Sequence, residues 1–433
     1  MKTTKVNAPI KACLCWIACF LAISGGGVDV ARAQVSSERA TGLAGQRERG
    51  LEMLREIKRT IDKNYFDPTY HSVDLNKHFS AAEDQIKDAV SGDQIYGIIA
   101  QSLLVFEDSH TFFIPPVWSF DVEYGWEMRM IGDECYVVAV DTGSDAAVKG
   151  VRPGDKVLAV FDIPPTRANL WQLEFLFYRL RPLRAMNVVL APPGAKPRSM
   201  ELFTATKPAT WKSVVEQQAR QRKSIHSYKE WGNELFFWKM GDFRLNDHGI
   251  DDMMGRVGQR NALILDLRGN PGGFERTLQR LVGYFFDHDV TLCEQRGRQG
   301  GKPIVAKTVK DKTFKGKLVV LVDSATASAG ELFARVIQLE KRGIVLGDRT
   351  AGAVTEAKHF YLDYRLVPGF VTSPSITYGV SVTINDLIMR DGKSLEHTGV
   401  TPDETLLPTA VDLRAGNDPA LLRAAQLLGV QIN

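Results

Sequence analysis

The residues best suited to chemistry lie in a segment of small side chains that follows an apolar run. Residues 318–322 read L-V-V-L-V, which predicts a buried parallel strand, and residues 331–339 have helical periodicity. Ser328 stands in the turn between them, directly before the helix. A helix start offers unpaired backbone N–H groups and a positive dipole end, which can serve both a hydroxyl nucleophile and an oxyanion. This turn is therefore a candidate catalytic site.

Each of the two candidate loops also has a purely structural interpretation. Ser328 and Glu331 have the S-x-x-E spacing of a capping box, which needs no catalytic role. A second loop, N-P-G-G at 270–273, follows a predicted strand at 262–267 and precedes a helical pattern at 275–286. Its free amides could supply an oxyanion donor, but a Pro-Gly-Gly sequence is also an ordinary tight turn.

The first 33 residues predict a secretory signal peptide. Lysines are followed by an apolar stretch at 12–24 and by Ala31-Arg32-Ala33, a small-x-small cleavage site. The apolar stretch is shorter than the roughly 20 residues of a membrane span. Without residues 1–33 the chain has 50 basic and 50 acidic residues, and this balance points to neither nucleic acid nor an anionic membrane. Only Cys135 and Cys293 then remain, enough for one disulfide at most.

Three regions can be distinguished along the remaining chain, which is long enough for two or three domains. Residues 36–104 have helical periodicity and lead into D-S-H-T at 108–111. Residues 118–205 predict short strands at 135–140, 156–161 and 186–190 around a helix at 170–180. The segment 143–160, with its Pro-Gly-Asp turn, resembles PDZ domains, which capture peptide ends by strand addition. From residue 235 onwards the pattern is strand, helix, strand.

Four motifs in this order resemble the C-terminal processing peptidase family, which includes tail-specific proteases and the tricorn protease. They are D-L-R-G-N-P-G-G at 266–273, T-A-S-A-G-E at 326–331, G-D-R-T-A-G at 347–352 and L-E-H-T-G-V-T-P-D at 395–403. The resemblance implies an α/β fold with a core of the ClpP and crotonase type. It also implies four segments: a signal peptide (1–33), an N-terminal helical region (34–117), a PDZ-like domain (118–205) and the peptidase core (206–433).

Within this resemblance the nucleophile falls on Ser328, and the oxyanion donors fall on the amides of Ala329 and of Gly272 or Gly273. Tail-specific proteases use a lysine as general base in a G-K-G context, where this chain has Gly352-Ala353-Val354. Lys358 comes five residues too late for that motif.

The tricorn-like branch uses histidine as the base instead, and histidine has a pKa near neutrality without special burial. His110 and Ser109 resemble the Ser-His pair of that branch, and Glu396 resembles the glutamate that orients it. His359 and His397 lie near the same motifs and compete for the role of base.

The sequence therefore predicts a secreted or periplasmic serine endopeptidase that acts on polypeptides, with the PDZ-like domain holding the substrate's C-terminus. The absence of H-E-x-x-H, clustered cysteines and a phosphate-binding loop predicts neither metal nor cofactor. The missing lysine leaves a second hypothesis, a catalytically inactive PDZ-containing scaffold that binds peptides. A third is a binder of hydrophobic small molecules, because relatives of this core bind retinoids.

Overall fold

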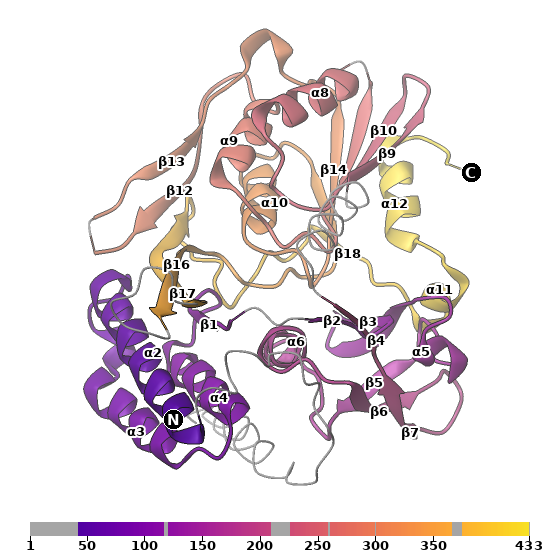
Figure 1. The fold of residues 1–433 in the computed structure, drawn as a ribbon. Coiled ribbons are helices and arrows are strands. Elements are labelled where there is room, and N and C mark those ends of the chain that lie inside the picture. The colour runs from indigo at the N-terminus through magenta and orange to yellow at the C-terminus, as the bar shows by residue number, and fades with distance from the viewer. Residues whose placement is uncertain are drawn as a thin grey trace, which may run out of the picture.

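The computed structural model describes residues 42–116, 120–208, 226–258, 260–298, 300–365 and 375–432. The predicted signal peptide at 1–33 lies outside these ranges. Figure 1 shows the N-terminal helices at one side of the molecule and the C-terminal helix at the opposite side.

Three amphipathic helices form the N-terminal part of the described chain. They are α2 (Leu43–Asn64), α3 (Leu75–Asp88) and α4 (Gly92–Leu103). Side chains of Asp74 and Ser91 cap the second and third helices by accepting hydrogen bonds from backbone N–H groups. Leu54, Ile57 and Ile61, which the helical spacing predicted to share a face, are fully buried. The apolar faces of these helices pack together and against the long strand β17 (Ser375–Met389).

A five-stranded antiparallel sheet occupies the region that resembles a PDZ domain. Its order is β3 (Trp126–Ile131), β4 (Glu134–Val140), β5 (Lys156–Val160), β6 (Ala185–Ala191) and β7 (Arg198–Phe203). The short helix α5 (Asp145–Val148) and α6 (Leu170–Phe175), which continues as a wider helical turn to Leu180, complete it. Strands β2 (Phe120–Glu123) and β8 (Ala205–Pro208) pair with each other at its entrance and exit. The predicted strands and helix of this region are confirmed, and they enclose a hydrophobic cluster of their own.

A second sheet of six strands carries both candidate loops, the N-P-G-G loop at 270–273 (the glycine loop) and the turn that contains Ser328 (the serine turn). Its order is β18 (Glu404–Thr405), β15 (Ile344–Gly347), β14 (Lys317–Val322), β11 (Ala262–Asp266), β10 (Leu235–Met240) and β9 (His226–Trp231). All neighbours are parallel except β9 and β10. The carboxyl ends of β11 and β14 therefore lie next to each other, and the loops that follow these strands meet there.

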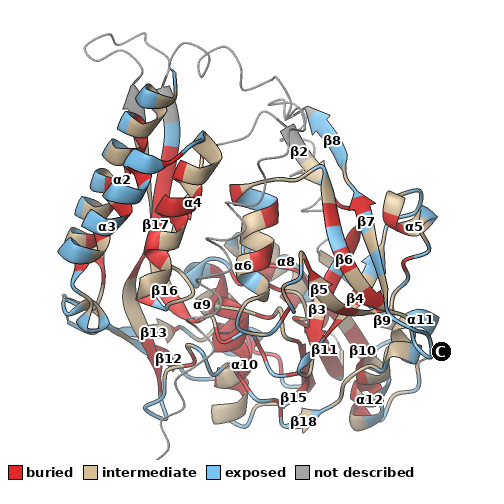
Figure 2. Cartoon of the chain, turned by 90° about the horizontal axis from the view of Figure 1, so that it is seen from below, coloured by how far each residue is buried: buried red, intermediate tan, exposed pale blue. Residues whose placement is uncertain are grey.

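Helices cover both faces of this sheet, which explains why residues 262–265 and 318–322 of its central strands are apolar. Helices α8 (Asp247–Val257), α9 (Glu275–Gly283) and α10 (Ala329–Leu339) pack on one face. Helix α12 (Pro419–Leu428) packs on the other, after the short α11 (Ala410–Ala415). Every residue of β11 is buried, and Figure 2 shows the buried strands between the helical layers.

A third sheet joins the N-terminal helices to the core. It consists of β1 (Phe112–Ile114), β17, β12 (Val290–Arg296) and β13 (Pro303–Ala306), with β16 (Thr355–Arg365) paired to β17. Strand β1 begins two residues after His110 and pairs with β17, with Phe112 opposite Ser381. This pairing fixes the D-S-H-T segment against the core.

Candidate active site

Ser328 has a backbone conformation that non-glycine residues rarely adopt. Its φ is +52° and its ψ is −121°, and it lies between the end of β14 and the first residue of α10. Such strain persists only where neighbouring contacts hold it. Here the Ser328 N–H donates to Ala353 O at 2.9 Å and to Glu331 Oε2 at 3.1 Å. A strained serine at a sharp strand-to-helix turn also characterises the nucleophile elbow of α/β-hydrolases.

Glu331 holds this turn against the segment 350–353. Its side chain is fully buried and accepts four hydrogen bonds, from Thr350 Oγ1 and from the backbone N–H groups of Gly352, Ala353 and Ser328. Burial raises the pKa of the Glu331 carboxyl to about 7, although the four hydrogen bonds oppose the shift. The S-x-x-E motif at 328–331 predicted the contact between Glu331 and Ser328. No sequence motif predicted the contacts of Glu331 to residues 350–353.

The glycine loop after β11 lies in direct contact with Ser328. A Cβ atom added to Gly272 would stand 2.6 Å from Ser328 Cβ and 3.0 Å from the Ala329 backbone nitrogen. Gly272 also has φ +91°, which side chains disfavour. Both features require glycine at this position, so the loop can approach the nucleophile closely.

The structure distinguishes the two glycine amides that the sequence left as alternatives. The Gly272 N–H donates to Asn270 Oδ1 at 2.8 Å, so it is already engaged. Gly273 is exposed, and its N–H has no acceptor within the described ranges. The two backbone hydrogen bonds to Phe243 at this point are made by the flanking residues Gly272 and Phe274. The Ala329 N–H stands at the first position of α10, where a helix provides no partner. Gly273 and Ala329 are therefore the available donors for an oxyanion.

We expect Gly272→Ala to damage both stability and reactivity. The new methyl group would collide with Ser328 and force a residue with φ +91° out of its conformation, so the loss should exceed the roughly 1–2 kcal/mol of a positive-φ alanine. The free energy of unfolding from urea denaturation and the labelling rate of Ser328 measure it. Gly143→Ala is the matched control, because Gly143 has φ +81° and open space around it. Equal destabilisation by both changes would contradict the close contact.

Asp108 organises the segment that carries His110. Its carboxylate accepts hydrogen bonds from the His110 and Thr111 N–H groups at 2.9 and 2.6 Å and from the hydroxyls of Thr111 and Thr383. Thr383 lies on β17, so the segment is tied to the third sheet. The sequence motif included Asp108 without indicating this function.

Three of the predicted site residues form one hydrogen-bonded network. Ser109 Oγ lies 2.6 Å from His110 Nδ1 and donates to Glu396 Oε2 at 3.0 Å, and the Ser109 N–H donates to Glu396 Oε1 at 2.7 Å. Because the Ser109 proton goes to the carboxylate, its oxygen accepts from His110 Nδ1–H. His110 Nε2 is then left with a free lone pair, which a base requires.

The network is connected to Ser328, the predicted nucleophile, through Val354 and Ala353, which are consecutive in the chain. Glu396 Oε2 accepts a hydrogen bond from the Val354 N–H at 2.7 Å, and the preceding residue, Ala353, accepts the Ser328 N–H. No hydrogen bond joins His110 directly to Ser328 in the part of the chain that the structure describes. Catalytic hydrogen bonds are often long until substrate binds.

Burial governs the protonation of this network. It lowers the pKa of His110 to about 4, with a further lowering from His359 and an opposing effect of Asp108. Burial also raises the pKa of Glu396, against the hydrogen bonds from Val354 and Ser109. At neutral pH the imidazole is neutral, as a proton acceptor must be.

The other candidate bases lie in different surroundings. His359 is exposed on β16 and its ring faces Phe112, while His397 is exposed on the turn next to Glu396. The Lys358 ammonium is exposed and stacks over the ring of Phe360. The hydrogen-bonded network includes none of these three side chains.

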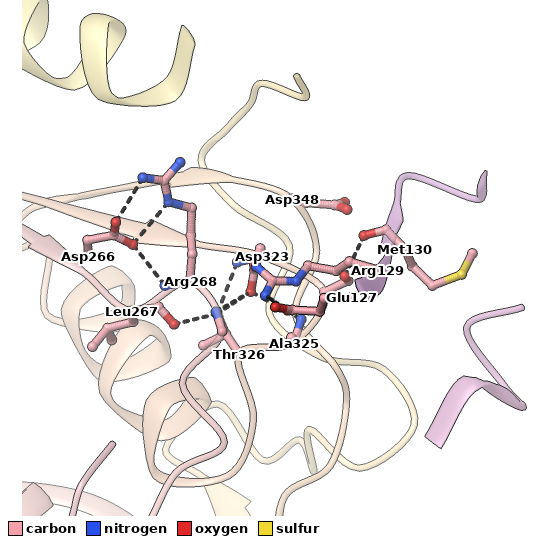
Figure 3. Close-up of polar contacts among 12 residues, drawn as sticks. Glu127, Arg129, Met130, Asp266, Leu267, Arg268, Asp323, Ala325, Thr326 and Asp348 are labelled. Atoms are coloured by element: carbon pink, nitrogen blue, oxygen red, sulfur yellow. Dashed lines mark hydrogen bonds and ion pairs between the residues drawn. The ribbon is translucent and has the colours of Figure 1, made fainter. Parts of the chain in front are cut away.

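Asp323 links the nucleophile turn, the glycine loop and the five-stranded sheet (Figure 3). Its carboxylate accepts from the Gly269 N–H at 2.8 Å, the Ala325 N–H at 3.1 Å and Thr326 Oγ1 at 3.1 Å. It also pairs with Arg129 of β3 at 2.7 Å. The geometry of the site therefore depends on contacts from β3.

Known proteins share this combination of fold and motifs. The model of peptidase family S41 matches residues 239–406. The tail-specific protease of Haemophilus influenzae is 25% identical over 296 residues, which are 65% of this chain and 41% of that protein. The carboxyl-terminal-processing protease of Synechocystis is 21% identical over 384 residues, 85% of this chain and 84% of that one. Over residues 239–406 the chain is thus similar to peptidase family S41, and its relatives over longer stretches are named as C-terminal processing or tail-specific proteases.

Solved structures share the α/β fold of this chain. Mature CPAF superposes with a TM-score of 0.64 at 14% identity, covering 89% of this chain and 96% of CPAF. The photosystem II D1 C-terminal processing protease gives 0.53 at 22% identity, covering 82% and 93%. The family consists of serine-type hydrolases, which places this chain in that enzyme class.

Within the described ranges of the chain, no helix is both long and apolar enough to cross a membrane. Ala353, at the position of the family's lysine, lies directly beside Ser328 but has no basic group.

Proposed function

We propose that the chain is a secreted or periplasmic endopeptidase that hydrolyses polypeptides through an acyl-enzyme, with Ser328 as nucleophile and His110 as general base. The path from Glu396 through Ser109 to His110 supports this most strongly, because it meets the nucleophile turn at Val354 and Ala353. Nucleophile, base and orienting groups in one network are what acyl transfer requires.

The proposed reaction begins when Ser328 Oγ attacks the carbonyl carbon of a peptide bond and its proton passes to His110 Nε2. The carbonyl oxygen takes the negative charge and accepts hydrogen bonds from the N–H groups of Gly273 and Ala329. The intermediate then expels the amine, which takes the proton from His110 and leaves an ester on Ser328. Water repeats the sequence with His110 as base, and the carboxyl product leaves.

Ser109 and Glu396 have a positioning role in this proposal. A histidine with a pKa near 4 is neutral but weakly basic, so its protonated form needs stabilisation in the transition state. The negative charge of Glu396 supplies this stabilisation through Ser109. The serine hydroxyl donates to the carboxylate and accepts from the imidazole, and it keeps its own proton throughout.

The inactive scaffold finds little support beside this proposal. The relatives with the longest alignments are named as proteases, and His110 provides a base where Ala353 replaces the lysine. The five-stranded sheet is proposed to present a substrate polypeptide by strand addition, as a PDZ-like domain would. Export rests on the N-terminal signal pattern at 1–33.

A serine-directed fluorophosphonate tests the proposed function directly. We expect the probe to label the folded chain once, on Ser328, because only a serine activated by a base and an oxyanion site reacts at a useful rate. Mass spectrometry of the digested adduct identifies the labelled residue, and Ser324 in the same turn should remain unlabelled. A folded chain that neither reacts with the probe nor cleaves an unfolded polypeptide would contradict the proposal.

A further inference from the structure

A hollow lies between β3 and the helical segment 170–180 in the PDZ-like sheet. It has a volume of about 330 Å³, part of it open to solvent. Residues of the strand and of the helical segment line it, among them Trp126, Glu127, Met128, Glu174, Phe177 and Tyr178. Most of the wall is aromatic or apolar, and the two charged groups among these six are both carboxylates.

Glu174 is a half-buried carboxylate without a partner. It makes no hydrogen bond or ion pair with the described part of the chain, whereas Glu127 pairs with Arg129. Burial raises the pKa of Glu174 to about 7, Glu127 adds to this shift and Arg129 opposes it. A buried acid with raised pKa gains most from a cation brought next to it.

A second polar group in the same hollow also lacks a partner. Trp126 is 7% exposed, and its indole N–H is buried without an acceptor among the described residues. Buried N–H groups in proteins are nearly always hydrogen-bonded. The hollow thus offers the Glu174 carboxylate to an occupant, and its wall contains one buried N–H group without an acceptor in the described part of the chain.

The strand that borders the hollow has a free edge and leads to the nucleophile turn. Strand β3 is the last strand of its sheet and pairs only with β4 within the described ranges. Near its far end Met130 O accepts a hydrogen bond from Ser324 Oγ, four residues before Ser328 (Figure 3). A segment added along β3 would therefore run from the hollow toward the active site.

We propose that the hollow binds a lysine or arginine side chain of a polypeptide laid along β3, with the cation beside Glu174. The aliphatic stem of such a side chain suits the apolar wall, and its charge complements the carboxylates. A terminal carboxylate would meet Glu174 and Glu127 with like charge, so recognition does not depend on a free C-terminus. This inference rests on the proposed function, because it names a feature of the substrate.

Binding to the intact chain tests the inference without catalysis. The probe is a fluorescein-labelled eight-residue peptide with one lysine between leucines, measured by anisotropy against the full-length Ser328→Ala variant. We expect acetylation of the lysine to weaken binding at least tenfold, and amidation of the C-terminus to change it less than twofold. Equal affinity of the lysine and acetyl-lysine peptides would overturn the proposal, as would a tenfold loss on amidation.

Glu174→Gln, combined with Ser328→Ala, provides the second arm. It should weaken the lysine peptide about tenfold and leave the acetyl-lysine peptide unaffected. Glu201→Gln is the matched control, because Glu201 is exposed on β7 at the opposite edge of the same sheet. Unchanged lysine binding by a folded Glu174→Gln chain would refute the inference. Failure of Ser328 labelling with intact lysine-dependent binding would refute only the proposed catalysis.

Discussion

Ser328→Ala is expected to lower kcat by about 10⁵-fold or more and to abolish covalent labelling, because no ester can form without the hydroxyl. Ser328 lies at the strained turn before α10, beside the glycine loop, whose Gly273 N–H has no acceptor among the described residues. The measurement is hydrolysis of an unfolded polypeptide by the purified variant, with circular dichroism to verify folding. The change removes one oxygen and leaves the backbone contacts to Ala353 and Glu331 in place.

Ser324→Ala serves as the matched control for this experiment. Ser324 stands in the same turn, but its hydroxyl is engaged with Met130 O. We expect it to retain labelling at Ser328. If Ser324→Ala lost all activity while Ser328→Ala kept it, the nucleophile would have been assigned to the wrong serine.

His110→Ala should reduce kcat/KM by about 10²–10⁴-fold and slow labelling to a similar degree, because the serine proton then has no acceptor. His359→Ala and His397→Ala are the controls, since these exposed residues compete for the role of base but lie outside the network. We expect both to stay within a fewfold of the parent chain. If one of these controls lost most of its kcat/KM while His110→Ala stayed active, that control's histidine would be the general base instead of His110.

The pH profile of kcat/KM gives an independent readout of the same residue. Burial lowers the pKa of His110 to about 4, so the neutral form persists below the ordinary histidine pKa of about 6.5. The imidazole should therefore cause no loss of activity near pH 6.5, and its own acid limb should lie near pH 4. Protonation of Glu396, whose pKa is raised by burial, would remove its charge. If the loss of kcat/KM at low pH disappears in the Glu396→Gln variant, that loss is caused by protonation of Glu396 and not of His110.

The sequence predicted those elements whose side-chain pattern is set by local periodicity. Residues 262–265 and 318–322 are wholly apolar because helices cover both faces of the sheet, and this burial was readable from the residue pattern alone. The helical spacing of residues 51–61 was equally informative because only one face of α2 is buried. The boundaries of the PDZ-like region and the signal peptide remain predictions.

The third sheet was not predicted, although it positions the proposed base. Strands β16 and β17 pair in a long hairpin, and β1 adds to β17 across more than 260 residues of sequence. Pairing at that separation depends on which edges tertiary packing brings together, and local pattern carries no information on it. The position of His110 therefore had no signal beyond its motif.

By itself the sequence determined the identity of the candidate groups, because a serine in a small-residue turn, a histidine and a glutamate have intrinsic chemistry that motifs reveal. Only the tertiary structure decided how they meet. Ser109 and Glu396 are 287 residues apart and hydrogen-bonded, and Val354 and Ala353 connect this pair to Ser328. The side chain of Asn270 likewise decided between the two glycine amides by engaging that of Gly272. Hydrogen bonds have strict distance and angle requirements, so partners distant in the chain are chosen by packing.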